Sequence, residues 1–131
     1  MALHRNFING EWLEGKGVRE NINPSDLSDI VGEYAQADKA QTEAAIAAAK
    51  AAQPAWAAAT PQVRADALEF IGTELLARKD EIGRLLSREE GKPLSNGIAE
   101  TMRAAQIFKF FAQETLRVEG VAVSSVRPGV D

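Results

Sequence analysis

"REEGKPLSN", residues 88–96, places a Gly-Lys step at the end of a long stretch with helical spacing of its apolar residues. A phosphate-binding loop would need a second glycine five residues before Gly91 and a Ser or Thr directly after Lys92. Leu86 and Pro93 hold these positions, so the stretch does not have the form of a phosphate loop. Gly91 is typical of the residue that follows a helix, and Pro93 prevents that helix from continuing. The stretch therefore predicts the end of one helix and the start of another.

A second glycine cluster, Gly15-Lys16-Gly17, lies near the start of the chain. A dinucleotide-binding fingerprint would need its third glycine at position 20, which is Glu20. Neither glycine cluster therefore has the pattern that cradles cofactor phosphates.

The residues before Gly91 carry a helical pattern. Thr60-Pro61 predicts a helix start, because threonine caps free amides and proline suits the first helical position. Apolar residues recur at helical spacing as far as residue 85. They are Leu68, Ile71, Leu75, Ile82 and Leu85. Gly72, Gly83 and the Lys79-Asp80 step indicate two helices joined near residue 79.

Two more helices are predicted on either side of this pair. Asp38 is a candidate N-cap, with Gln41 at the reciprocal position of a capping box. Alanine, the strongest helix former, then continues the helix to Pro54. Ser95 or Asn96 is expected to cap the last helix.

Extended segments precede the helices. Asn9-Gly10 between apolar flanks is the strongest short signal for a β-hairpin. Strands are expected at residues 19–22 and 30–34, separated by a turn at residues 23–26. Valines in residues 118–126 predict a further strand. The fold class is therefore α/β: an N-terminal β-hairpin and short strands, three to four α-helices, and a C-terminal extended strand.

The composition excludes several classes of protein. The 131 residues carry a net charge of −4, and Lys and Arg are scattered among acids, so a nucleic-acid partner is not expected. No apolar stretch is long enough to cross a membrane, and the first residues lack a signal-peptide core. We therefore expect a cytoplasmic protein without a membrane partner.

The sequence has no cysteine and a single histidine, His4. The lack of cysteine excludes disulfides, thiolate metal sites and a thiol nucleophile on this chain. One histidine cannot build a multi-histidine metal site, and its place near the start of the chain argues against a catalytic triad.

Six short motifs, in order, resemble the opening of the NAD(P)-dependent aldehyde dehydrogenase superfamily. They are "FINGEW" (7–12), "NINPSD" (21–26), "PAW" (54–56), "RADAL" (64–68), "EEGKPL" (89–94) and "FKFFA" (108–112). The residues of these motifs are most similar to those of bacterial enzymes that oxidise semialdehydes of short dicarboxylic acids, such as α-ketoglutaric semialdehyde (2,5-dioxopentanoate). The resemblance implies that residues 1–131 form the N-terminal, incomplete part of the cofactor-binding domain. It also implies an oxidoreductase that converts an aldehyde substrate to the acid with NAD or NADP, as a homo-oligomer.

The family's catalytic groups follow later in the chain than residue 131. They are a cysteine thiolate that attacks the aldehyde, a glutamate that activates water, and an asparagine that stabilises the oxyanion. The glycine turn for the cofactor phosphates also follows later. The resemblance therefore implies that this chain alone binds no NAD(P) and is inactive. It would be an artificial truncation, a proteolytic product or a gene fragment.

Members of the family often hold a monovalent cation near this segment. Backbone carbonyls before the Asn-Pro turn and a carboxylate before the Gly-Lys step supply its ligands. By position these residues are Asn21, Ile22 and Glu89, and oxygen ligands of this kind suit a hard cation. The family usually has aspartate where Glu89 stands. The alternative is that Glu89 and Glu90 are solvated charges at a helix end.

A different class of function also fits the residues. The second hypothesis is a self-standing helical interaction module that docks on another protein without catalysis. A dehydrogenase segment should expose a large apolar patch and be unstable or oligomeric alone. A module should unfold cooperatively as a monomer.

Overall fold

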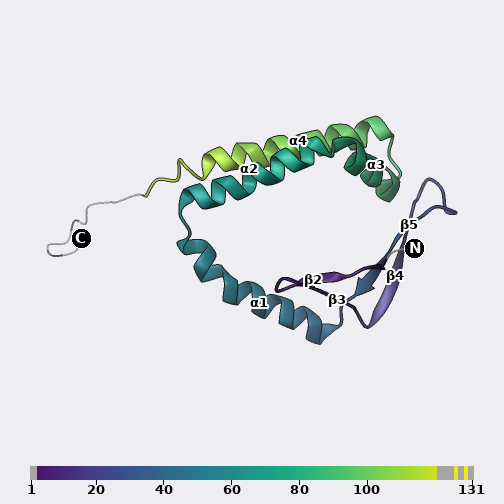
Figure 1. Cartoon of the computed structure of the whole chain (residues 1–131), viewed down its shortest axis with the longest axis horizontal. Helices are drawn as coiled ribbons and strands as arrows, with labels where there is room; N and C mark the ends of the chain where they lie inside the picture. The colour runs from purple at the N-terminus through teal and green to yellow at the C-terminus, as the bar shows by residue number, and fades with distance from the viewer. Residues whose placement is uncertain (1–2, 121–125, 127–128, 130–131) are drawn as a thin grey trace.

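The computed structural model of the chain describes residues 3–120, 126 and 129. Short strands come first and helices follow, which confirms the predicted α/β class (Figure 1). The strands are β1 (Leu3–His4), β2 (Asn6–Ile8), β3 (Glu11–Leu13), β4 (Gly17–Ile22) and β5 (Ile30–Gln36). The helices are α1 (Lys39–Ala58), α2 (Pro61–Ala77), α3 (Lys79–Glu90) and α4 (Leu94–Glu114).

The predicted hairpin is formed by β2 and β3, which pair antiparallel with Phe7 opposite Trp12. Both turn residues have positive φ, 52° at Asn9 and 83° at Gly10. Asparagine and glycine adopt this conformation more easily than other residues, so the Asn-Gly signal identified the turn correctly.

The other three strands form a sheet in the order β1-β5-β4. β4 runs antiparallel to β5, as the turn between them requires, and β1 pairs parallel with the other edge of β5. Strand β1 was not predicted, because two residues are too few to show an alternating pattern. His4 on β1 stacks on the Tyr34 ring with centroids 4.7 Å apart.

Small residues hold α2, α3 and α4 together. α2 and α4 lie side by side, and α3 packs beside α4 near its start (Figure 1). A Cβ on Gly72 of α2 would lie 3.0 Å from the Ala105 carbonyl of α4, and one on Gly97 of α4 would lie 2.3 Å from the Gly83 carbonyl of α3. The helix backbones therefore approach each other at a distance that only glycine allows.

These contacts correct two details of the helix predictions. The junction between α2 and α3 does lie next to residue 79, but Gly72 and Gly83 do not mark it. Both glycines are buried inside helices, where close packing outweighs their low helix propensity. α4 begins at Leu94 after Pro93, with no side-chain cap, so the expected cap by Ser95 or Asn96 was wrong.

Helix α1 stands apart from this group and lies alongside β2 (Figure 1). The Asp38 side chain accepts a hydrogen bond from the Gln41 amide (2.8 Å), as predicted. The Gln41 side chain does not reciprocate, because it bonds Asn6 and the Glu14 carbonyl instead. The helix also continues through Pro54, although proline lacks the N–H that would bond the Lys50 carbonyl.

The described core is made of alanine. The buried apolar side chains are Ala35, Ala65, Ala105 and Ala112, and no large side chain among the described residues is fully buried. Large apolar side chains instead remain exposed along α2 and α4, among them Phe70, Ile107, Phe110 and Phe111. A core of this size stabilises a chain weakly, since alanine buries little apolar area.

Two predictions concern the end of the chain and membranes. Residues 118–120 are in no strand, and residues 121–125 of the predicted C-terminal strand lie outside the described residues. Within the described part of the chain, no helix combines the length and the apolar character needed to cross a bilayer.

Candidate functional site

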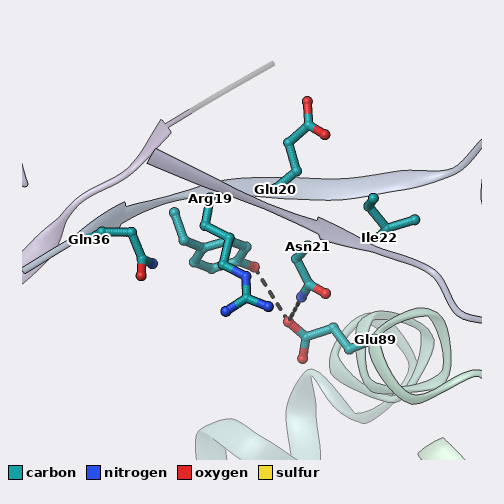
Figure 2. Close-up of a pocket in the computed structure, with 7 residues that line it drawn as sticks. Arg19, Glu20, Asn21, Ile22, Gln36 and Glu89 are labelled. Carbon is teal, nitrogen blue, oxygen red and sulfur yellow. Dashed lines mark hydrogen bonds between the residues drawn. The ribbon is translucent and has the colours of Figure 1, made fainter. Parts of the chain in front are cut away.

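A polar pocket lies between one face of the β4–β5 pair and the last turn of α3. Its volume is about 590 Å³ and it opens to solvent (Figure 2). It is lined by Arg19, Glu20, Asn21, Ile22, Tyr34, Gln36 and Glu89. Three of these residues, Asn21, Ile22 and Glu89, are those expected from the sequence at a cation site.

The strand register explains which side chains face α3. Arg19 lies directly opposite Tyr34 in the antiparallel pair, so the two share a face of the sheet. Asn21 is two residues after Arg19 and therefore falls on the same face. In Figure 2, Arg19 and Asn21 point toward the helix, whereas Glu20 points away from it. Alternation along the strands thus builds the pocket wall.

Glu89 connects the helix to this wall. Its Oε1 accepts a hydrogen bond from Asn21 Nδ2 at 2.7 Å. The Tyr34 hydroxyl donates to the same oxygen over a longer 3.4 Å. Both bonds are partly buried, and they join residues far apart in the sequence. The carboxylate is therefore a fixed contact between sheet and helix rather than a freely solvated charge.

The neighbouring Arg88 makes a second connection. Its Nε donates to Asp29 Oδ2 at 2.8 Å and its Nη2 to Asp29 Oδ1 at 2.5 Å, a two-pronged pair. Asn23 Nδ2 also donates to Asp29. The hydrogen bonds from Arg88 and then from Asn23 lower the pKa of Asp29 from its usual 3.8 to about 2. The pair anchors the start of β5 on the end of α3.

The Gly-Lys step completes this sheet–helix contact. Gly91 ends α3 with φ 68°, in the left-handed conformation predicted for a residue that follows a helix. Ser25 Oγ donates to the Gly91 carbonyl at 2.8 Å. A Cβ on Gly91 would lie 2.6 Å from Ser25 Oγ and 2.8 Å from Pro24 Cγ. The step therefore turns the chain and packs against the Asn-Pro turn.

The structure brings the three predicted cation ligands together, but their donor set fits a cation poorly. The register of β4 against β5 shifts between Asn21 and Ile22. This shift interrupts the hydrogen-bond ladder at the two residues whose backbone carbonyls would bind the cation. However, the Asn21 amide nitrogen points at Glu89, and the Arg19 guanidinium lines the same pocket. The cation site stays a prediction.

Sequence reasoning did not single out Arg19, Tyr34 and Gln36 as pocket residues. Strand alternation could have indicated them, because Arg19 stands two residues before Asn21 and Tyr34 two residues before Gln36, so each pair lies on one face of its strand. Using it required the register of β4 against β5, which the sequence does not reveal.

The described residues that line the pocket include no thiol, lysine or histidine. The pocket offers one guanidinium, one phenol, two amides and two carboxylates, and the whole sequence lacks cysteine. Such groups can bind, orient and hold elements together. The arrangement thus positions the sheet on the helices.

Comparisons with known proteins cover almost the whole chain. Residues 12–131 match the sequence profile described as the aldehyde dehydrogenase family. An alpha-ketoglutarate semialdehyde dehydrogenase of Haloferax volcanii is 32% identical over 129 residues, which are 97% of this chain and 27% of that protein. A glutarate-semialdehyde dehydrogenase of Pseudomonas putida is 32% identical over 123 residues, or 93% of this chain and 26% of that protein.

Solved structures show the same fold. A double mutant of Staphylococcus aureus betaine aldehyde dehydrogenase, in complex with NAD+, matches with a TM-score of 0.88 and 26% identity. The match covers 95% of this chain and 26% of that one. The chain thus spans about a quarter of the length of the relatives it matches. By the profile match over residues 12–131, this chain belongs to the aldehyde dehydrogenase family.

Proposed function

We propose that this chain is the N-terminal part of the cofactor-binding domain of an aldehyde dehydrogenase. The whole protein would oxidise an aldehyde to the carboxylic acid and pass the hydride to NAD+ or NADP+. The continuous match over residues 12–131 and the shared fold support this role. We place the protein in the cytoplasm.

The aldehyde we propose is a semialdehyde of a short dicarboxylic acid. The relatives named for alpha-ketoglutarate semialdehyde and glutarate semialdehyde support this substrate class. The NAD+ bound to the Staphylococcus aureus enzyme supports a nicotinamide cofactor. The choice between NAD and NADP rests on residues outside this chain.

The 131 residues alone are proposed to be inactive. The carrying observation is the absence of cysteine, because the reaction of this family begins with a thiolate bonding to the carbonyl carbon. Neither glycine cluster has the pattern that cradles cofactor phosphates, and Gly91 is occupied by its contact with Ser25. The chain would hold the scaffold in place while other residues perform the oxidation.

The exposed apolar side chains support a larger assembly. Phe70 is 67% exposed, Phe110 56% and Ile107 48%, all on α2 and α4. Large apolar side chains exposed on two neighbouring helices favour burial against further protein. We propose that the remainder of the enzyme covers it, and that the whole protein is a homo-oligomer.

The exposed surface also favours a second candidate, a helical interaction module without catalysis. The two functions differ in how the isolated chain behaves. Size-exclusion chromatography and urea unfolding distinguish them. A self-associated or weakly folded chain fits the dehydrogenase segment, whereas a monomer with one cooperative transition fits the module.

Activity is tested on the purified 131-residue chain, free of any longer dehydrogenase. The chain is mixed with a semialdehyde and NAD+ or NADP+, and formation of the reduced cofactor is followed. We expect no rate above that of a boiled sample. Cofactor reduction, or a labelled acyl group trapped on the chain, would contradict the proposed inactivity.

A further inference from the structure

We propose that Arg19, and not a bound metal ion, balances the charge of Glu89 in the pocket between β4–β5 and α3. The pocket would therefore be insensitive to sodium and potassium. The proposal concerns only residues of this chain, and it stands whether or not the whole protein oxidises a semialdehyde.

The first argument is placement. Arg19 and Asn21 leave β4 on the same face, and Asn21 bonds Glu89 directly. Figure 2 shows the Arg19 guanidinium on the side of the sheet where Glu89 lies. The positive group thus shares the pocket with the carboxylate.

The second argument is charge. Among the described residues 3–120, neither Arg19 nor Glu89 takes part in an ion pair. The nearby Arg88 and Asp29 already neutralise each other, and Glu20 points away from the helix. Arg19 from β4 and Glu89 from α3 therefore line the same pocket from opposite sides, and Glu20 lines it with its side chain directed away from the helix. Arg19 is the one cationic side chain among the described residues that line the pocket, so a further cation beside Glu89 would be repelled by its guanidinium.

The third argument is hydrogen bonding. Glu89 Oε1 accepts from the Asn21 amide and the Tyr34 hydroxyl. Both donors present a partial positive charge to the oxygen that a cation would need. Arginine remains charged at every ordinary pH, so its repulsion of a cation persists throughout that range. One oxygen of the Glu89 carboxylate is therefore already hydrogen-bonded by the pocket wall.

The test compares cation dependence in four forms of the chain. Urea unfolding, followed by tryptophan fluorescence, is measured in sodium, potassium and choline chloride at equal ionic strength. Equilibrium dialysis with Rb+ counts bound cations directly. The variants are Arg19→Met, Arg19→Lys and the double change Arg19→Met with Glu89→Gln.

The wild-type chain should show the same urea midpoint in all three salts and hold no Rb+. Arg19→Met should bind up to one Rb+ per chain and unfold at higher urea in sodium or potassium than in choline, since a ligand stabilises the state that binds it. Arg19→Lys, the matched control, keeps the charge and should behave as wild type. The double variant should lose the dependence again.

Two results would overturn the proposal. One is stoichiometric Rb+ binding, or a salt-specific shift, in the wild-type chain. The other is an Arg19→Met chain that binds no Rb+ and is indifferent to the salt, whether it is folded or not. Neither readout involves an aldehyde or NAD(P), so failure here leaves the proposed dehydrogenase function standing.

Discussion

Helix α1 and the α2–α4 group are both rich in small residues, yet they pack in opposite ways. None of the residues of α1 is buried, although alanine dominates its sequence. The α2–α4 group buries small residues on every helix. These are Ala65, Gly72, Gly83, Gly97, Thr101, Ala105 and Ala112. The difference lies in the neighbours and not in the composition.

A small side chain contributes to packing only where another backbone comes close enough to cover it. In the α2–α4 group, glycine on one helix faces glycine or alanine on the next, so backbones meet directly. α1 contacts mainly the β2 strand, where Asn6 donates a hydrogen bond to Gln41, and it meets no other described helix closely. Alanine on α1 therefore stabilises the helix through its propensity, whereas glycine on α4 allows the backbone of α3 to come close.

The largest predicted effect comes from Gly97→Ala. The new Cβ would lie 2.3 Å from the Gly83 carbonyl, and a backbone atom cannot move aside as a side chain would. We expect a loss of about 3 kcal/mol in the free energy of unfolding, measured by urea titration with far-UV circular dichroism. Gly120→Ala is the matched control, because nothing lies within 4 Å of its Cβ. Equal stability of the two variants would refute the close α3–α4 contact.

The next effect is expected from Gly91→Ala. The residue has φ 68°, and its Cβ would meet the Ser25 and Pro24 side chains. Left-handed strain and this contact together should lower the free energy of unfolding by about 2 kcal/mol. Gly10→Ala shares the positive φ but has nothing within 4 Å, so it isolates the strain. If both variants lose the same stability, Gly91 does not pack on the Asn-Pro turn.

The Asp29–Arg88 pair predicts a pH dependence. The folded pKa of Asp29, about 2, lies below its usual 3.8, so the pair stabilises the fold above the usual value. This stability is lost as pH falls from about 4 toward 2, when the folded state must also take up the proton. Asp29→Asn should remove this part of the acid sensitivity, followed by tryptophan fluorescence. Glu119→Gln, on the exposed tail, is the control and should retain the wild-type profile.

Local signals in the sequence predicted turns, helix caps and helix ends well, but they predicted contacts between distant segments poorly. Asn9-Gly10, Asp38, Thr60-Pro61 and Gly91 each act on their own backbone, so each identified its turn, cap or helix end. The two-residue β1, which depends on its pairing with β5, was missed, and so was the helical run through Pro54.

The candidate site also depends on contacts between distant segments, which local signals do not predict. The Glu89 contact with Asn21 joins segments 68 residues apart, and only the resemblance to a family placed the two together. Arg19 and Tyr34 needed the register of β4 on β5, which depends on the folded sheet. Gly72 and Gly83 were taken for a helix break, because a sequence does not show which helix will pack across a glycine.

The smallest effect separates the two regions most directly. Ala47→Val on α1 adds two methyl groups at an exposed position, so only helix propensity changes, by about 0.5 kcal/mol. The same change at Ala105, which is 1% exposed on α4, must fit against α2 and should lower the unfolding free energy by about 2 kcal/mol. Urea unfolding of the two variants compares one substitution in two helical settings. If Ala47→Val proved as damaging as Ala105→Val, α1 would be covered in solution, and its isolation from the other helices would not hold.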